Sequence, residues 1–306
     1  MAKYRSQTVR ANRIGKTSWF DYFNVIFMAL FCTTILYPFL NMFARSFSTD
    51  AAIMLGKVFV WPVNFNTYGY RMVVVSSSFY TALKNTLFIA VAGSALNLSI
   101  TLSAGYVFAR GVPGKKVLFL LVLFTMFFNG GMIPTYLIIR KLNLYDTYGA
   151  YIFPAAFGAF NMILARNFFQ NLPREVFESA QIDGCNDLRM FIRIALPMSK
   201  PVVATLSLFV IVGFWNMFMP GILYTISNHM STLQMYIRRV VFLSQMGLDT
   251  GATLASHYES QDASNLYNQE PIKAVVLVLG TVPVLCVYPF LQKYFVHGIN
   301  MGAVKG

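Results

Sequence analysis

The feature of this sequence that most limits its fold is a series of six apolar stretches. Each has about the length that a helix needs to cross a bilayer core, roughly 20 residues for about 30 Å. They cover residues 22–44, 85–109, 117–139, 147–165, 201–224 and 274–292. The runs are continuous, whereas the strands of a membrane barrel alternate apolar and polar residues over about ten positions. Because backbone groups in lipid must be bonded internally, the sequence predicts an all-α polytopic membrane protein with six transmembrane helices.

The composition excludes the soluble alternatives. Of the 306 residues, 57% are hydrophobic and only 11% are charged, and the surface of a water-soluble protein needs more polar residues than that. The net charge of +13 would suggest nucleic acid in a soluble protein, but the basic residues flank apolar stretches and form no nucleic-acid motif. We therefore expect no nucleic-acid partner. The three cysteines and three histidines have no metal-ligand spacing, so we also expect no metal site.

The basic residues also predict the orientation of the chain. Fifteen lysines and arginines fall before the first stretch, after the second, after the fourth and after the sixth, and nine fall in the other, longer loops. Basic residues gather on the cytoplasmic side of a membrane. We therefore expect a cytoplasmic N-terminal segment at 1–20, a six-helix transmembrane domain at 21–295 and a cytoplasmic tail at 296–306, with both termini in the cytoplasm.

The loop between the fourth and fifth stretches, residues 171–201, is rich in charge although its surroundings are apolar. Apolar residues recur on one helical face over 174–182, and an Asp-Gly turn signal follows at Gly184. Asn186 can cap a second helix, and Pro197 is expected to end it. The loop is therefore predicted to be two short helices joined by a turn.

Residues of this loop resemble the EAA loop of ABC importer permeases. In that family the pattern is roughly E-A-A, three residues, G, nine residues and I-x-L-P. The corresponding residues here are Glu178, Ser179, Ala180, Asp183, Gly184, Ile194, Leu196 and Pro197. Ser179 departs from the alanine of the pattern but is also small. The resemblance implies a cytoplasmic coupling helix that contacts an ATPase, with Glu178 bonding to the partner and small residues allowing close approach.

Four other segments are similar to the maltose-permease type of carbohydrate importer subunit. They are WPVNFNTYGY (61–70), KNT (84–86), GGMIPTYL (130–137) and GAVKG (302–306). The segment at 130–137 looks most like permeases for complex, often acidic oligosaccharides. The resemblance implies a type I ABC importer permease fold in the cytoplasmic (inner) membrane of a bacterium. It also implies a second permease subunit, a dimeric cytoplasmic ATPase, an extracytoplasmic sugar-binding protein and an oligosaccharide substrate.

The chain itself has no G-x-x-x-x-G-K-[ST] phosphate loop, so we expect a non-catalytic subunit with no cofactor of its own. ATP and Mg would then be bound by the partner ATPase. In the maltose type the C-terminus reaches into the ATPase pair, and the resemblance assigns that contact to Val304, Lys305 and Gly306. A frayed tail is the alternative for these residues.

Polar and aromatic residues inside the apolar stretches are candidates for a sugar path. They are Asn97, Asn129, Tyr136, Asn161, Trp215 and Asn216. A hydrogen bond to a neighbouring helix is the alternative for each, because an unpaired amide is costly in lipid. The stretches hold no dominant buried acid or base, which disfavours the alternative function of an ion-coupled secondary sugar carrier.

Overall fold

The computed structural model of the protein describes residues 19–111, 113–246 and 270–302, and no strand occurs among them. The helices are α1 (Trp19–Ser46), α2 (Asp50–Met54), α3 (Tyr68–Val75), α4 (Ser77–Arg110), α5 (Lys115–Phe127), α6 (Met132–Lys141), α7 (Tyr148–Ile152), α8 (Ala159–Gln170), α9 (Arg174–Ile182), α10 (Asp187–Met190), η1 (Phe191–Ala195), α11 (Leu196–Met198), α12 (Lys200–Trp215), α13 (Met219–Tyr224), η2 (Asn228–Met230), α14 (Leu233–Met246) and α17 (Glu270–Gly302). The predicted all-α class is confirmed for these residues.

Among the described residues, three helices are long and apolar enough to cross a membrane. They are α1, α4 and the part of α17 from residue 270 to 287. Two further segments qualify only as bent pairs: α5 with α6, at 112°, and residues 187–198 with α12, at 86°. The stretches predicted at 22–44, 85–109 and 274–292 are therefore long helices, whereas the count of six spans stays a prediction.

The third predicted stretch, 117–139, is not one continuous helix. α5 ends at Phe127 and α6 begins at Met132, and between them Gly131 has φ of +87°. Glycine weakens a helix interior because it loses the most backbone freedom on folding. Two adjacent glycines in an apolar run therefore break the helix, although mean hydropathy alone favours continuity.

The fourth and fifth stretches are interrupted too. The fourth consists of α7 and α8, separated by residues 153–158, where Pro154 removes a backbone donor. The fifth consists of α12, a short break after Trp215 and then α13, which has a proline in its first turn. Both stretches therefore enclose non-helical backbone that sequence periodicity does not reveal.

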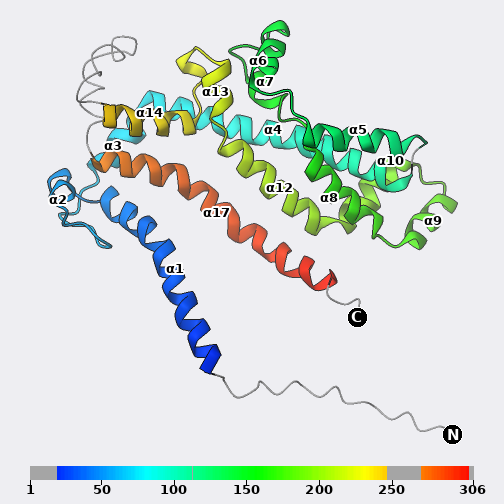
Figure 1. The fold of residues 1–306 in the computed structure, drawn as a ribbon, viewed down its shortest axis with the longest axis horizontal. Coiled ribbons are helices and arrows are strands. Elements are labelled where there is room, and N and C mark those ends of the chain that lie inside the picture. Colours follow the sequence, from blue (N-terminus) through cyan, green and yellow to red (C-terminus); the bar gives the residue numbers. More distant parts are fainter. Residues whose placement is uncertain (1–18, 112, 247–269, 303–306) are drawn as a thin grey trace.

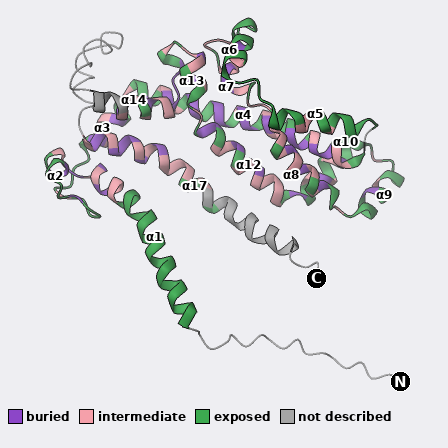
Figure 2. Ribbon diagram, viewed as in Figure 1, coloured by how far each residue is buried: buried purple, intermediate pink, exposed green. Residues whose placement is uncertain are grey.

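The core of the protein lies around α4, which packs against α8 on one side and α12 on another. Figure 2 shows buried residues concentrated on α4 and on the first part of α17, whereas most of α1 is exposed. Two glycines permit the close approach. A Cβ at Gly105 would lie 2.8 Å from that of Ala165 in α8, and one at Gly93 would lie 2.6 Å from the Phe214 ring in α12.

The two ends of the molecule are distinct in Figure 1, where α2, α3 and the start of α17 lie at one end and α9 and α10 at the other. At the first end, Arg45 of α1 pairs with Glu270 of α17 at 2.7 Å, and the Asp50 carboxylate accepts a bond from the Glu270 amide at 2.9 Å. These contacts join α1 and α2 to α17, whereas the N-terminal part of α1 diverges from the other helices (Figure 1).

Candidate functional site

The loop predicted to carry the coupling helix folds into α9, with the boundaries that its sequence favours. Of the nine residues of α9 only Phe177 is buried, whereas Glu178 and Ser179 are exposed. The Ser179 hydroxyl donates to the Glu175 carbonyl at 2.8 Å, so it is satisfied within the helix. The exposed face of α9 therefore has a free carboxylate beside a small side chain, as close contact with a partner requires.

The turn after α9 is a Schellman motif. The Gly184 amide donates to the Gln181 carbonyl at 3.0 Å, and the Cys185 amide donates to the Ala180 carbonyl at 2.9 Å. Gly184 has φ of +76°, and a Cβ there would meet no atom within 4 Å. A side chain at this position is therefore disfavoured by the backbone conformation alone, since there is room for it.

The second helix of the loop begins as its cap predicts. The Asn186 side-chain oxygen accepts a bond from the Arg189 amide at 2.9 Å. The helix then passes through a π-helical turn at 191–195 and ends at Met198, so the prediction that Pro197 ends it is wrong by one residue. Pro197 lies in the last turn of this helix, which directly follows the π-helical turn.

The remaining residues of the EAA-like pattern divide between the core and the surface. Ile194 and Leu196 pack partly against an apolar cluster that includes Leu102, Phe169 and Leu206. Asp183 and Pro197 are exposed. Some residues of the pattern therefore pack against the rest of the protein, and others are exposed to the surroundings.

Phe177 belongs to the apolar face predicted for this helix, but the sequence does not identify its partners. Phe177 packs near Tyr106 of α4, with ring centroids 6.5 Å apart. The guanidinium carbon of Arg110, at the end of α4, lies 4.7 Å from the Phe177 ring centroid. The sequence marks Arg110 only as one of the cytoplasmic basic residues, because its aromatic partner is distant in the chain.

Two of the six candidates for the sugar path are engaged inside the protein. The Asn97 amide donates to the Ala155 carbonyl at 2.7 Å, and its oxygen accepts a bond from Thr101 at 3.2 Å. The indole nitrogen of Trp215 donates to the Gly280 carbonyl at 3.0 Å. Both side chains are buried, and these hydrogen bonds are of the kind that the alternative, contact between neighbouring helices, requires.

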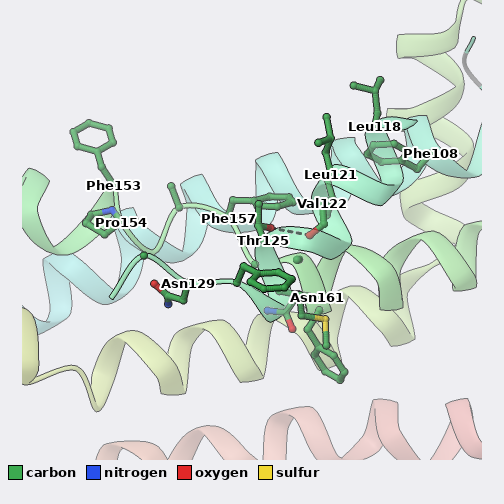
Figure 3. Close-up of a pocket in the computed structure, with 17 residues that line it drawn as sticks. Phe108, Leu118, Leu121, Val122, Thr125, Asn129, Phe153, Pro154, Phe157 and Asn161 are labelled. Atoms are coloured by element: carbon green, nitrogen blue, oxygen red, sulfur yellow. Dashed lines mark hydrogen bonds between the residues drawn. The ribbon is translucent and has the colours of Figure 1, made fainter. Parts of the chain in front are cut away.

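Asn129 and Asn161 line one open cavity of about 930 Å³ between α5 and α8. Figure 3 shows the two amides with apolar side chains that come from α4, α5, α8 and the non-helical segments between them. The aromatic residues that line this cavity are Phe108, Phe128, Phe153, Phe157 and Phe160. An apolar and aromatic wall with a few amides can pack against sugar rings and bond their hydroxyls.

Tyr136 and Asn216 lie elsewhere. Tyr136 belongs to an aromatic group with Tyr145 and Tyr224, at centroid distances of 6.0 and 6.3 Å. The Asn216 oxygen accepts a bond from Gln234 at 3.1 Å, beside a smaller cavity of about 280 Å³. The structure therefore does not bring the six candidates together at one site.

The KNT segment contains a junction of hydrogen bonds that the sequence does not reveal. Asn85 donates to the carbonyls of His229 and Ser231 at 2.6 and 2.9 Å, and accepts from the Tyr148 hydroxyl at 2.7 Å. The Thr86 hydroxyl accepts from the Leu233 amide at 2.7 Å. These buried bonds fix the loop before α14 onto α4.

Asp146 fixes a second loop. Its carboxylate accepts bonds from the Ile226 amide at 3.2 Å, the Ser227 amide at 3.1 Å and the Ser227 hydroxyl. Burial raises the pKa of Asp146, but these three bonds outweigh burial and hold the pKa below its usual value. The carboxylate is therefore charged at neutral pH and joins the segment before α7 to the segment after α13.

Within the described ranges, no cluster of histidine, cysteine or acidic side chains has the arrangement of a metal site. The predicted tail contact of Val304, Lys305 and Gly306 lies outside the described residues.

Comparison with known proteins identifies a family. Residues 98–301 match the model of the family described as "Binding-protein-dependent transport system inner membrane component". Protein LplC of Bacillus subtilis (strain 168) is 42% identical over 300 residues, with 98% of each chain covered. The polygalacturonan/rhamnogalacturonan transport system permease protein YtcP of the same organism is 37% identical, covering 95% of this chain and 100% of YtcP.

A solved structure agrees with these relatives. A chain in the crystal structure of a bacterial ABC transporter involved in the import of the acidic polysaccharide alginate superposes with a TM-score of 0.81. It is 30% identical in sequence, and the match covers 90% of this chain and 96% of that chain.

Proposed function

We propose that this chain, which belongs to the family of binding-protein-dependent transport system inner membrane components, forms half of the translocation pathway of an ATP-driven oligosaccharide importer. Its similarity to permease proteins along nearly the whole chain supports this function. The alternative of an ion-coupled secondary carrier is set aside on that ground. The chain contributes no catalysis, and hydrolysis of ATP with Mg takes place on a dimeric cytoplasmic ATPase.

The observation that carries the proposal is the position of α9. It projects at the end of the molecule opposite to α2 (Figure 1), it is anchored through Phe177, and it exposes Glu178 and Ser179. A rigid projecting helix can be seated in a groove of the ATPase and can follow that groove when ATP binds. Closure of the ATPase then biases the membrane helices between inward-open and outward-open states.

The remaining parts of the assembly follow from this role. In the topology we propose, with six spans, residues 1–20, the loop 171–201 and the tail from 296 lie in the cytoplasm, where Val304, Lys305 and Gly306 add a second ATPase contact. A second permease subunit completes the pathway in the inner membrane. The extracytoplasmic sugar-binding protein delivers its ligand to the end of the molecule that holds α2 and α14.

The substrate class we propose is an acidic oligosaccharide. The YtcP name refers to polygalacturonan and rhamnogalacturonan, and the similar crystal structure belongs to an alginate importer. The cavity beside Asn129 and Asn161 offers amide groups and aromatic rings, which suit sugar hydroxyls and ring faces. Uptake of galacturonate and mannuronate oligomers by proteoliposomes, compared with neutral oligosaccharides of equal length, tests this class.

The coupling role is tested at Gly184 in the purified complex. Gly184→Val forces a β-branched residue into a left-handed backbone conformation, so we expect assembly to persist and sugar-stimulated ATP hydrolysis to be lost. Gly184→Asn is the matched control, because asparagine tolerates this conformation, and it should keep the stimulation. Normal coupling in the valine variant contradicts the role of the loop.

A further inference from the structure

The helix α9 is held to the rest of the protein through one buried side chain. Phe177 is 5% exposed, whereas most other residues of α9 are exposed. The ring of Phe177 lies against α4 and belongs to a cluster with Tyr106 and Phe169. Ala180 of α9 also packs against this cluster, but its side chain is small and half-buried. A helix held mainly through one large side chain can turn about it unless a further contact sets its orientation.

Arg110 provides such a contact. It is the last residue of α4, and its guanidinium carbon lies 4.7 Å from the Phe177 ring centroid and 5.8 Å from the Tyr106 centroid. Both distances are within the range of about 6 Å for a cation–π contact. A planar guanidinium also stacks on aromatic faces, which the compact ammonium of lysine cannot do.

The same guanidinium reaches the helix on the far side of the Gly184 turn. Its Nη2 atom lies 3.8 Å from Oδ1 of Asp187 and 3.7 Å from Sδ of Met190. The Asp187 side chain is 80% exposed, so this ion pair adds little, whereas the Arg110 side chain is only 29% exposed. The contact with the Phe177 ring is therefore the stronger of the two.

We propose that Arg110 is a positioning residue that fixes the orientation of α9 on the end of α4. Movement of α9 is then passed to α4, and through its packing to α8 and α12, instead of being lost as rotation about Phe177. This inference rests on the proposed function, because it takes the ATPase as the partner that moves α9.

The coupling is measured on the complete complex in nanodiscs. The dissociation constant of the loaded sugar-binding protein is determined without and with a non-hydrolysable ATP analogue. The constant without the analogue divided by the constant with it is greater than one when the two sites are coupled, and this ratio reports the coupling free energy. Arg110→Met keeps a long apolar side chain but loses the charged plane, and we expect the ratio to move about fivefold toward one. Arg110→Lys should give an intermediate ratio.

Arg166→Met is the matched control. The Arg166 guanidinium makes a contact of the same kind, 4.4 Å from the ring centroid of Phe119, but it joins α8 to α5. This variant should leave the ratio unchanged. An unchanged ratio in Arg110→Met, or an equal fall in both variants, overturns the proposal for Arg110.

Two further measurements keep the result decisive. A cross-link to the ATPase through the cysteine of Glu178→Cys, in an otherwise wild-type complex, tests the proposed function by itself. If no cross-link forms, the coupling role of α9 is refuted. If Arg110→Met does not assemble, the effect of Arg110→Lys on the ratio is measured in two backgrounds, the wild-type chain and the chain that carries Phe177→Leu. The proposal requires the lysine substitution to lower the ratio only when the Phe177 ring is present, and equal effects overturn it.

Discussion

Replacing Gly105 by alanine should force α4 and α8 apart. The added Cβ would lie 2.8 Å from the Cβ of Ala165, 3.1 Å from the Arg166 amide nitrogen and 3.3 Å from the Met162 carbonyl oxygen. Carbon atoms in good contact are about 3.5–4.0 Å apart, so the first of these contacts alone is short by about 0.7 Å. Two of the three atoms belong to backbone and cannot rotate away.

We therefore expect Gly105→Ala to lower the free energy of unfolding by about 1–3 kcal/mol, the usual cost of an extra methyl group in a packed core. Unfolding in mixed SDS–maltoside micelles, followed by far-ultraviolet circular dichroism, measures this difference. Gly213→Ala in α12 is the control, because a Cβ there meets no atom within 4 Å and alanine favours a helix over glycine.

A compensating substitution sharpens the test. Ala165→Gly removes the atom with the shortest contact, so the double variant should lose less stability than the sum of the two single losses, which a double-mutant cycle measures. Rescue should be partial, because the Arg166 and Met162 backbone atoms remain. Equal stability of Gly105→Ala and wild type, or equal losses at Gly105 and Gly213, would refute the close-packing argument.

Three other predictions concern polar groups. Asn85→Leu should cost about 2–4 kcal/mol in the same titration, because it leaves two carbonyls and the Tyr148 hydroxyl without their buried partner. Trp215→Phe should cost about 1 kcal/mol for its lost bond to Gly280 and should leave the KM of transport unchanged. A raised KM would show that Trp215 contacts the sugar. Asp146 has a folded pKa below its unfolded value, so its stabilisation is present above pH of about 4 and is lost only as pH falls through the folded pKa. Amide exchange at Ile226 and Ser227, corrected for intrinsic rates, should therefore be equal at pH 5 and pH 8, and faster in Asp146→Asn.

The sequence is most informative where the structure depends on neighbours in the chain. The long helices α1, α4 and α17 follow from uninterrupted apolar runs. The boundaries of α9, the left-handed Gly184 and the Asn186 cap follow from turn and capping residues. In each case the determining contacts span only a few residues, so a local pattern suffices.

The roles of polar residues in the apolar helices depend on distant partners. Composition identifies Asn97 and Trp215 as unusual, but their acceptors are Ala155 and Gly280, on other segments. The same holds for Arg110, whose charge indicates the side of the membrane while its contact with Phe177 depends on the packing of α4 against the loop. A single sequence contains no information on such pairs.

The structure differs from the prediction of six continuous helices at short non-helical breaks within the apolar stretches, and the positions of these breaks are informative. Non-helical backbone at membrane depth is tolerated where it lines a cavity or is buried in protein, because lipid cannot satisfy its polar groups. The breaks at 128–131 and 153–158 both border the same cavity, with Asn129 inside the first break and Asn161 just after the second. The polar backbone groups of the two breaks and the two amides are therefore the hydrogen-bonding groups of a cavity whose other side chains are mostly apolar. The two irregular segments, which mean hydropathy does not reveal, therefore border the cavity that we propose as the sugar path beside α5 and α8.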